Sequence, residues 1–168
     1  KKNVAAFQNS FPRHVSMFHG CYVNYNYPQL GKDLVSVMNA LGYGVHLLEN
    51  EKCCGTALIS NGMIDQAKRN AANNIESMRK SVYERQMPVI STSSSCTFTM
   101  RDEYPHLLGV KNEDVRDYIE LATRFIYKLI DQDKVKLVFK KGYKAKVAYH
   151  TPCHMERLGW GIFSTELI

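Results

Sequence analysis

Short runs rich in apolar residues alternate with stretches of helical periodicity along this chain, and this alternation is the strongest constraint on its fold. The runs occupy residues 15–19, 45–48, 88–92 and 147–149, each of a length that suits a buried strand. Strands that alternate with helices form βαβ units, which build a parallel sheet covered by helices. We therefore predict an α/β fold with a Rossmann-like open, mostly parallel sheet flanked by helices.

The helical stretches are recognised by apolar residues spaced three and four positions apart. One such face runs from residue 30 to 41 behind Pro28, and a longer one runs from residue 64 to 82. A short helix is predicted over residues 96–103, ending before Pro105. Asn112 suits the N-cap of a further helix, whose apolar face runs from residue 115 to 129.

The composition excludes several classes of protein. With 168 residues, 45% hydrophobic and 23% charged, the chain is typical of a globular protein of about one domain. No apolar run approaches the roughly 18 residues of a membrane-spanning helix, and residues 3–8 lack the apolar stretch of a signal peptide. The chain begins with Lys1 and ends at Ile168 within an apparent helix, so we expect a piece of a longer protein.

The net charge of +6 favours acidic partners in general. Much of it lies in residues 134–146 and 68–85, and neither segment carries a nucleic-acid-binding motif. We therefore expect no nucleic-acid partner, and we note only a weak match to an anionic membrane surface.

The five cysteines are an odd number in a chain without a secretory signal, which argues against a disulfide framework. Each follows an apolar run and precedes a helical stretch. The carboxyl ends of parallel strands lie along one edge of a sheet, where ligands bind. Helix N-termini there favour thiolates, which bind soft metals. The sequence thus predicts a metal or cluster site, with inert buried thiols as the alternative. The candidates are Cys21, Cys53, Cys54, Cys96 and Cys153.

Cys53 and Cys54 are adjacent, and neighbours on an extended stretch point in opposite directions. They can serve one centre only from a tight turn, which Gly55 permits, or by binding different irons. This favours a multinuclear iron–sulfur cluster over zinc, whose paired ligands usually have two or more residues between them. Zinc stays open as an alternative. A thiol–disulfide redox protein is a weaker one, because the chain contains no Cys-x-x-Cys.

Cys21, the triplet at residues 53–55 and the segment Ser93-Ser-Ser-Cys96 resemble, in type and spacing, the CCG repeat of the heterodisulfide reductase B-subunit family. The resemblance covers essentially the whole chain. Members of this family usually carry two such repeats after two ferredoxin-type motifs. The resemblance therefore implies a first CCG domain at residues 1–148 and the truncated start of a second at residues 149–168. Four segments outside or around the cysteine pattern also resemble one subunit of this family in particular. They are residues 19–32, 51–55, 101–105 and 149–156.

The family pattern ends in Cys-x-x-Cys, whereas this chain has Ser93 in place of the first of these two cysteines. The implied cofactor is an iron–sulfur cluster of the 4Fe–4S type, cubane or non-cubane, with zinc or an empty site in this fragment as the alternatives. The resemblance assigns cofactor binding to four thiols of the first repeat and metal binding in the second repeat to a fifth. These are Cys21, Cys53, Cys54 and Cys96, followed by Cys153.

The resemblance implies an electron-transfer subunit of an oxidoreductase complex that does no substrate chemistry itself. In the branch that serves anaerobic respiration, flavin-containing catalytic subunits oxidise sn-glycerol 3-phosphate, and the iron–sulfur subunit passes the electrons towards menaquinone. Such a subunit lies peripherally on the cytoplasmic face of the bacterial inner membrane and docks its partner there. The alternative is a zinc-stabilised or metal-free CCG module that joins subunits and has no redox role.

Overall fold

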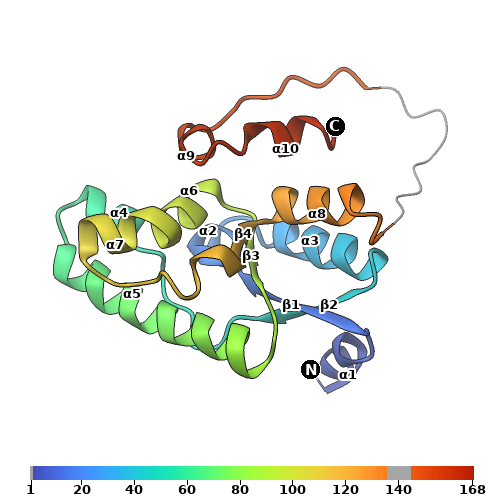
Figure 1. The fold of residues 1–168 in the computed structure, drawn as a ribbon, viewed down its shortest axis with the longest axis horizontal. Coiled ribbons are helices and arrows are strands. Elements are labelled where there is room, and N and C mark those ends of the chain that lie inside the picture. The colour runs from blue at the N-terminus through green and yellow to red at the C-terminus, as the bar shows by residue number, and fades with distance from the viewer. Residues whose placement is uncertain (1, 136–144) are drawn as a thin grey trace.

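The structure, a computed structural model, describes residues 2–135 and 145–168. Within these residues the strands form one sheet in the order β2-β1-β3-β4, and every pair is parallel (Figure 1). This arrangement confirms the predicted α/β class. The strands are β1 (Arg13–Phe18), β2 (Tyr43–Leu47), β3 (Val89–Ser91) and β4 (Ile119–Leu121).

Helices precede, connect and follow the strands. The α-helices are α1 (Lys2–Asn9), α2 (Gly20–Tyr25), α3 (Pro28–Ala40), α4 (Thr56–Ser60), α5 (Ile64–Arg79), α6 (Ser94–Phe98), α7 (Tyr104–Leu108), α8 (Ala122–Asp131), α9 (Cys153–Arg157) and α10 (Gly161–Thr165). The π-helical turns are η1 (Lys80–Glu84) and η2 (Thr99–Glu103), and a 3-10 turn, η3, spans Arg116–Tyr118.

The sheet is buried on both faces, because successive residues of a strand point to opposite sides. In β1, Val15 and Met17 pack into one core with residues of α3 and α8. Phe18 joins the other core, with residues of α5 and α7. Figure 1 shows α3 and α8 above the sheet and α5 below it. The central strand β1 is therefore fixed from both sides, and so is the loop that follows it.

The fourth strand is not where the sequence pattern predicted it. Residues 145–152 have no regular secondary structure, and residue 144 lies outside the described residues, as do residues 136–143 of the basic segment. Instead, β4 interrupts the stretch 115–129 that the pattern assigned to one helix, and α8 begins only after it. The reason is tertiary: β4 pairs with the open edge of β3, and this pairing outweighs the local helical periodicity.

A second correction concerns the helix after β3, which was expected to end before Pro105. The chain instead continues from α6 through the π-helical turn η2 into α7. In η2 the Tyr104 amide bonds to the Thr99 carbonyl, five residues back. Proline lacks an amide hydrogen and normally disrupts a helix. The wider turn admits it here, but leaves the carbonyls of Met100 and Arg101 without the amide that a residue other than proline would supply.

Asn112 supplies the missing hydrogen bonds. Its side-chain Nδ2 donates to the carbonyl oxygens of Met100, at 2.7 Å, and Arg101, at 3.0 Å, and Asn112 is fully buried. Arg116 Nε adds a hydrogen bond to the Arg101 carbonyl at 3.2 Å. Asn112 is therefore not the N-cap of a long helix, as the sequence suggested. It closes the backbone hydrogen bonding that Pro105 interrupts.

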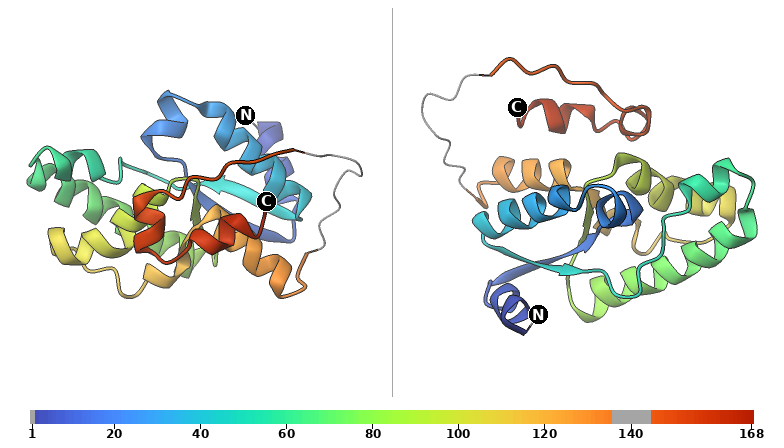
Figure 2. Two further views of the ribbon diagram at one scale, coloured as in Figure 1. Left: turned by 90° about the horizontal axis from the view of Figure 1, so that it is seen from above. Right: turned by 180° about the vertical axis from the view of Figure 1, so that it is seen from behind.

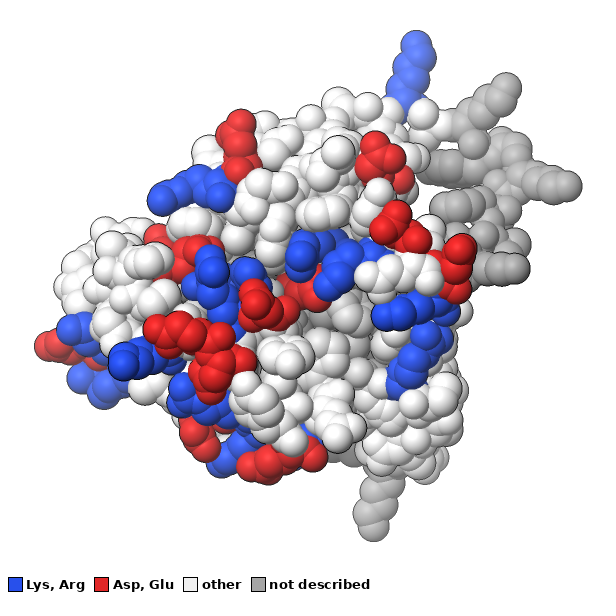
Figure 3. All heavy atoms as spheres, viewed as in Figure 1, with Lys and Arg blue, Asp and Glu red and all other residues white. Residues whose placement is uncertain are grey.

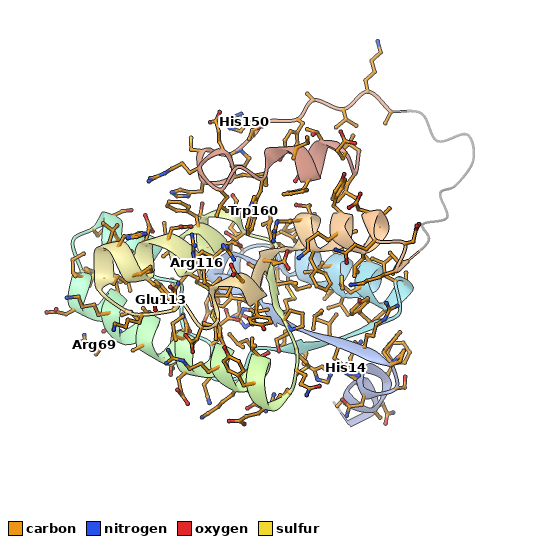
Figure 4. All side chains as sticks on the ribbon, viewed as in Figure 1. His14, Arg69, Glu113, Arg116, His150 and Trp160 are labelled. Carbon is orange, nitrogen blue, oxygen red and sulfur yellow. The ribbon has the colours of Figure 1, made fainter. Side chains whose placement is uncertain are left out.

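The C-terminal helices α9 and α10 lie over α6 and α8, and both views of Figure 2 agree on this. Met155 and Trp160 pack with Leu121 in a small core of their own. The guanidinium groups of Arg101 and Arg124 lie 4.9 and 4.4 Å from the Trp160 ring. Figure 4 shows Trp160 pointing from this segment towards the sheet domain. The contact is therefore a combination of apolar packing and cation–π attraction.

Charges of both signs interleave on the face shown in Figure 3. Several are paired, among them Arg79 with Asp114 at 2.7 Å and Arg116 with Asp102 at 2.6 Å. The positive net charge is thus not gathered into a single basic patch on this face. Across residues 2–135 and 145–168, no helix combines the length and apolarity needed to cross a membrane.

The role of Asn112 gives a prediction about stability. Replacing it (Asn112→Ala) should lower the free energy of unfolding by about 2 kcal/mol, because two buried carbonyls lose a donor. Urea denaturation measures the change. In a Pro105→Ala background the restored amide can satisfy one of these carbonyls, so the same replacement should cost less. An equal cost in both backgrounds would contradict the pairing of Asn112 with the proline turn.

Candidate metal centre

A cavity of about 460 Å³ lies at the carboxyl ends of the strands. It is lined by residues 19–23 after β1, by residues 53, 54, 56 and 57 after β2, and by residues 92–96 after β3. From β1 the chain turns to β2 on one side of the sheet, and β3 lies on the other side. Loops leave in opposite directions at such a switch point, which opens the crevice where α/β folds bind ligands.

The structure brings four of the five candidate cysteines into this cavity. Cys21 is the second residue of α2, Cys53 and Cys54 lie in the loop before α4, and Cys96 is in α6. Cys54 and Cys96 are buried, Cys53 is half-buried and Cys21 is exposed. Cys153 is the first residue of α9, is exposed and does not line the cavity. The assignment of these thiols as ligands remains a prediction.

The thiols of Cys53, Cys54 and Cys21 influence one another's protonation. A hydrogen bond with Cys54, together with burial, raises the pKa of Cys53. The hydrogen bond with Cys53 lowers the pKa of Cys54, but its contact with Cys96 and its burial outweigh this and raise the pKa to about 12. Partial burial and the neighbouring Cys53 raise the pKa of Cys21. A thiolate formed here is desolvated and lies beside other thiols, so a positively charged metal centre would stabilise it.

Cys96 is the exception, since its pKa is lowered. A hydrogen bond from Cys54 and one from Ser93 both favour its thiolate, against the effect of burial. Ser93 is also the N-cap of α6: its Oγ accepts a hydrogen bond from the Cys96 amide at 3.2 Å. The residue that replaces the expected fifth cysteine thus supports the start of the helix that carries Cys96.

Glu51 connects the loop after β1 to the loop after β2. Its carboxylate accepts hydrogen bonds from the amides of His19, at 3.0 Å, and Gly20, at 2.8 Å, and His19 Nδ1 lies 3.3 Å from it. Burial raises the pKa of Glu51, although His19 and the two amides act in the other direction. Gly20 itself needs a positive φ of 69°, which favours glycine. Together these contacts fix the distance between the loops that carry Cys21 and Cys53.

The donor set suits an iron–sulfur cluster by its chemistry. It consists of thiols, which as thiolates are the ligands of iron–sulfur clusters and also of zinc. Gly55, with φ of 98°, gives the turn that lets two adjacent cysteines face the same cavity. Among the residues that the structure describes, no group of three or more His, Cys, Asp or Glu side chains is arranged around the position of a single metal ion.

Reasoning from the sequence missed two supporting residues. Glu51 stands two positions before Cys53, and an acidic residue there gave no independent signal of its bonds to the loop after β1. Thr56 lies 3.2 Å from the Cys54 sulfur through its hydroxyl group. A threonine at the start of a helix most often indicates capping, so its type alone could not have revealed this contact.

The comparisons with known proteins agree with the geometry. The family described as CCG, cysteine-rich domain, matches residues 15–101, a range that contains the four cavity cysteines and excludes Cys153. The C subunit of the anaerobic glycerol-3-phosphate dehydrogenase of Escherichia coli K12 is 52% identical over 99% of this chain and 42% of its own length. The chain thus spans less than half of that relative.

More distant relatives share the same region. The D subunit of the dihydromethanophenazine:CoB–CoM heterodisulfide reductase of Methanosarcina mazei is 33% identical over 85% of this chain and 34% of its own length. Lactate utilization protein A of Bacillus velezensis is 33% identical over 86% of this chain and 59% of its own length. No solved structure matches significantly. The family match covers just over half of the chain and confirms the resemblance inferred from the cysteine pattern, so this chain belongs to the CCG cysteine-rich domain family.

Proposed function

We propose that this chain is part of an iron–sulfur electron-transfer subunit of an anaerobic sn-glycerol-3-phosphate dehydrogenase. The observation that carries the proposal is the convergence of four thiols, from three strand ends, on one cavity at the switch point of the sheet. The similarity to the C subunit of an enzyme with that printed name supports the substrate class. The ligands we propose are Cys21, Cys53, Cys54 and Cys96.

Each side of the cavity has its own task in this proposal. A bound 4Fe–4S-type cluster supplies one-electron transfer at a potential set by its ligands, burial and hydrogen bonds. The buried Cys54 and Cys96 side excludes water, while Glu51 holds the loop of Cys21 against the loop of Cys53. Cys21 is exposed and stands beside Tyr22, whose side chain is also exposed. This open side is where we expect a redox partner to approach.

The proposed partners follow from the relatives. The name of the E. coli protein makes it one subunit of a dehydrogenase, which supports catalytic subunits as partners of this chain. Three further features of the proposal rest on the family resemblance. The catalytic subunits carry flavin, the electrons go on to menaquinone, and the complex lies peripherally on the cytoplasmic face of the inner membrane. They are part of the proposal for the whole protein.

We also propose that residues 149–168 begin a second CCG repeat, after a first domain that ends near residue 148. Cys153 stands at the first position of α9 and is exposed, as a ligand of a neighbouring site would be. The segment is attached to the first domain through Trp160 and through His154, whose Nδ1 lies 2.9 Å from Ser95 Oγ in α6. The two repeats would therefore meet at the helix that carries Cys96.

Iron analysis tests the proposed site. Protein purified without oxygen should contain iron and sulfide and give an electron paramagnetic resonance signal when poised at a suitable potential. Replacing a buried ligand (Cys54→Ser or Cys96→Ser) should weaken metal binding by at least about 10-fold. Loss of a residue that merely hydrogen-bonds to a metal ligand already costs about 10-fold in affinity, so loss of a ligand itself should cost no less. Replacing Cys153, which lies outside the cavity (Cys153→Ser), should leave the signal of the first site intact.

The alternatives give different results. Zinc without iron would overturn the electron-transfer proposal in favour of a zinc-stabilised docking module. Protein without any metal, still folded, would favour the metal-free module. Equal loss of the signal in Cys153→Ser and Cys54→Ser would contradict the assignment of ligands.

A further prediction separates the two possible roles of Ser93. If it acts as the cap of α6 and not as a ligand, Ser93→Ala should cost about 1 kcal/mol of stability and leave the iron content unchanged. Ser93→Thr keeps a hydroxyl group and serves as the matched control, with stability near that of the original protein. Thermal unfolding and iron analysis of both variants give the answer. Loss of iron in Ser93→Ala but not in Ser93→Thr would make Ser93 a ligand.

A further inference from the structure

A line of hydrogen bonds leads away from the Cys54 sulfur into the helix after β3. The Cys54 Sγ lies 3.2 Å from Thr56 Oγ1, which lies 2.7 Å from Thr99 Oγ1. Thr99 Oγ1 donates in turn to Glu103 Oε2 at 2.5 Å. The line joins the loop after β2 to the π-helical turn η2 and ends on a carboxylate.

The donor in each hydrogen bond of this line can be assigned by starting from the Glu103 carboxylate, which only accepts. Thr99 has one hydroxyl hydrogen, which it donates to Glu103. The 2.7 Å contact between the threonines therefore needs the hydrogen of Thr56, which leaves Thr56 none for the Cys54 sulfur. The contact between Thr56 and Cys54 then holds a hydrogen only while the thiol gives its own to Thr56 and not to Cys96. Thr99 is fully buried, so no water can supply a replacement donor there.

This direction has a consequence when Cys54 is a metal-bound thiolate, because the thiolate has no hydrogen to donate. As long as Glu103 accepts from Thr99, the Thr56 hydroxyl is committed to Thr99 and cannot donate to the sulfur. A donor in place of the carboxylate would reverse the line: Thr99 would donate to Thr56, and Thr56 to Cys54. The group at position 103 thus decides whether the ligand sulfur receives a hydrogen bond.

We propose that Thr56, Thr99 and Glu103 form a relay through which Glu103 withholds a hydrogen bond from the Cys54 sulfur and so holds down the reduction potential of the centre. The proposal rests on the function proposed above, in that Cys54 binds a redox centre. Glu103 is a positioning residue, since it touches no ligand itself. Hydrogen bonds to the sulfurs of such a centre are among the factors that set its potential. A donor stabilises the more negative reduced state, so withholding it favours the oxidised state.

The π-helical turn η2 carries two of the three relay residues. Thr99 and Glu103 are the first and last residues of η2, and their side chains meet across it. Glu103 is half-buried, whereas Thr99 has no exposure, so the relay joins a partly solvated carboxylate to a buried thiol. Turns of this kind occur often at functional sites.

The test is a redox titration of the anaerobically purified protein, followed by electron paramagnetic resonance. Glu103→Gln keeps the shape and provides an amide that can donate to Thr99, so the midpoint potential should shift to a more positive value. Because this variant also removes a charge, it is compared with the double variant Glu103→Gln/Thr56→Val and with Thr56→Val alone. The relay predicts that the Thr56→Val background abolishes most of the shift. Glu113→Gln removes a charge from an exposed residue that makes no hydrogen bond to the relay (Glu113 is labelled in Figure 4), so it controls for the charge and should give little shift.

A second measurement uses the metal-free protein and does not depend on a cluster. There, a Thr56 hydroxyl that donates to sulfur favours the thiolate of Cys54, so Glu103→Gln should raise its alkylation rate, mapped by mass spectrometry. Thr56→Val should again remove the increase. Melting temperatures confirm that the variants are folded.

The outcomes separate the two proposals. Absence of an iron signal from the original protein would overturn the proposed function, while the alkylation result would still decide on the relay. An iron signal whose potential shifts equally with and without the Thr56→Val replacement would overturn the relay and leave the proposed function standing. An unchanged alkylation rate in Glu103→Gln would also overturn the relay.

Discussion

The order of the strands is the constraint on which the rest of this structure depends. Because β1 lies between β2 and β3, the loops that leave β1 and β3 diverge, and space opens above the centre of the sheet. Burial on both faces fixes β1, so the loop that carries Cys21 starts from a rigid position. Glu51 then ties this loop to the one that carries Cys53 and Cys54. The strand order thus brings the cysteine-bearing loops together, and the Glu51 carboxylate fixes two of these loops relative to each other.

Much of the fold and the four cavity cysteines could be predicted from the sequence, because both depend on a regular pattern. Cysteines after successive strands must meet if the strands are parallel. The fourth strand could not be predicted in this way. Its residues Ile119–Leu121 are continuous with the apolar face of α8, and only the open edge of β3 distinguishes them. A pairing with a distant strand leaves no local trace in the sequence.

The helix after β3 shows a different limit. Pro105 correctly indicated a disturbance, but the chain responded with a wider turn and not with a helix end. That response requires Asn112, seven positions later, to satisfy the carbonyls that the proline leaves open. The position of Asn112 before an apolar stretch suggested a cap, since the same amide that caps a helix can also bond to distant carbonyls. Local rules identify the type of residue but not its partner.

The helix after β3 also joins the candidate metal centre to the C-terminal segment. The helix that Ser93 caps carries Cys96, continues into the π-helical turn with Thr99 and Glu103, and contacts α9 through Ser95. Arg101, within the same turn, lies against Trp160 of the C-terminal segment. The C-terminal segment therefore contacts the same continuous helix that supplies Cys96 and, through Thr99, the hydroxyl groups beside Cys54. If residues 149–168 begin a second repeat, as we propose, that repeat meets the first at the helix that carries the proposed ligand Cys96.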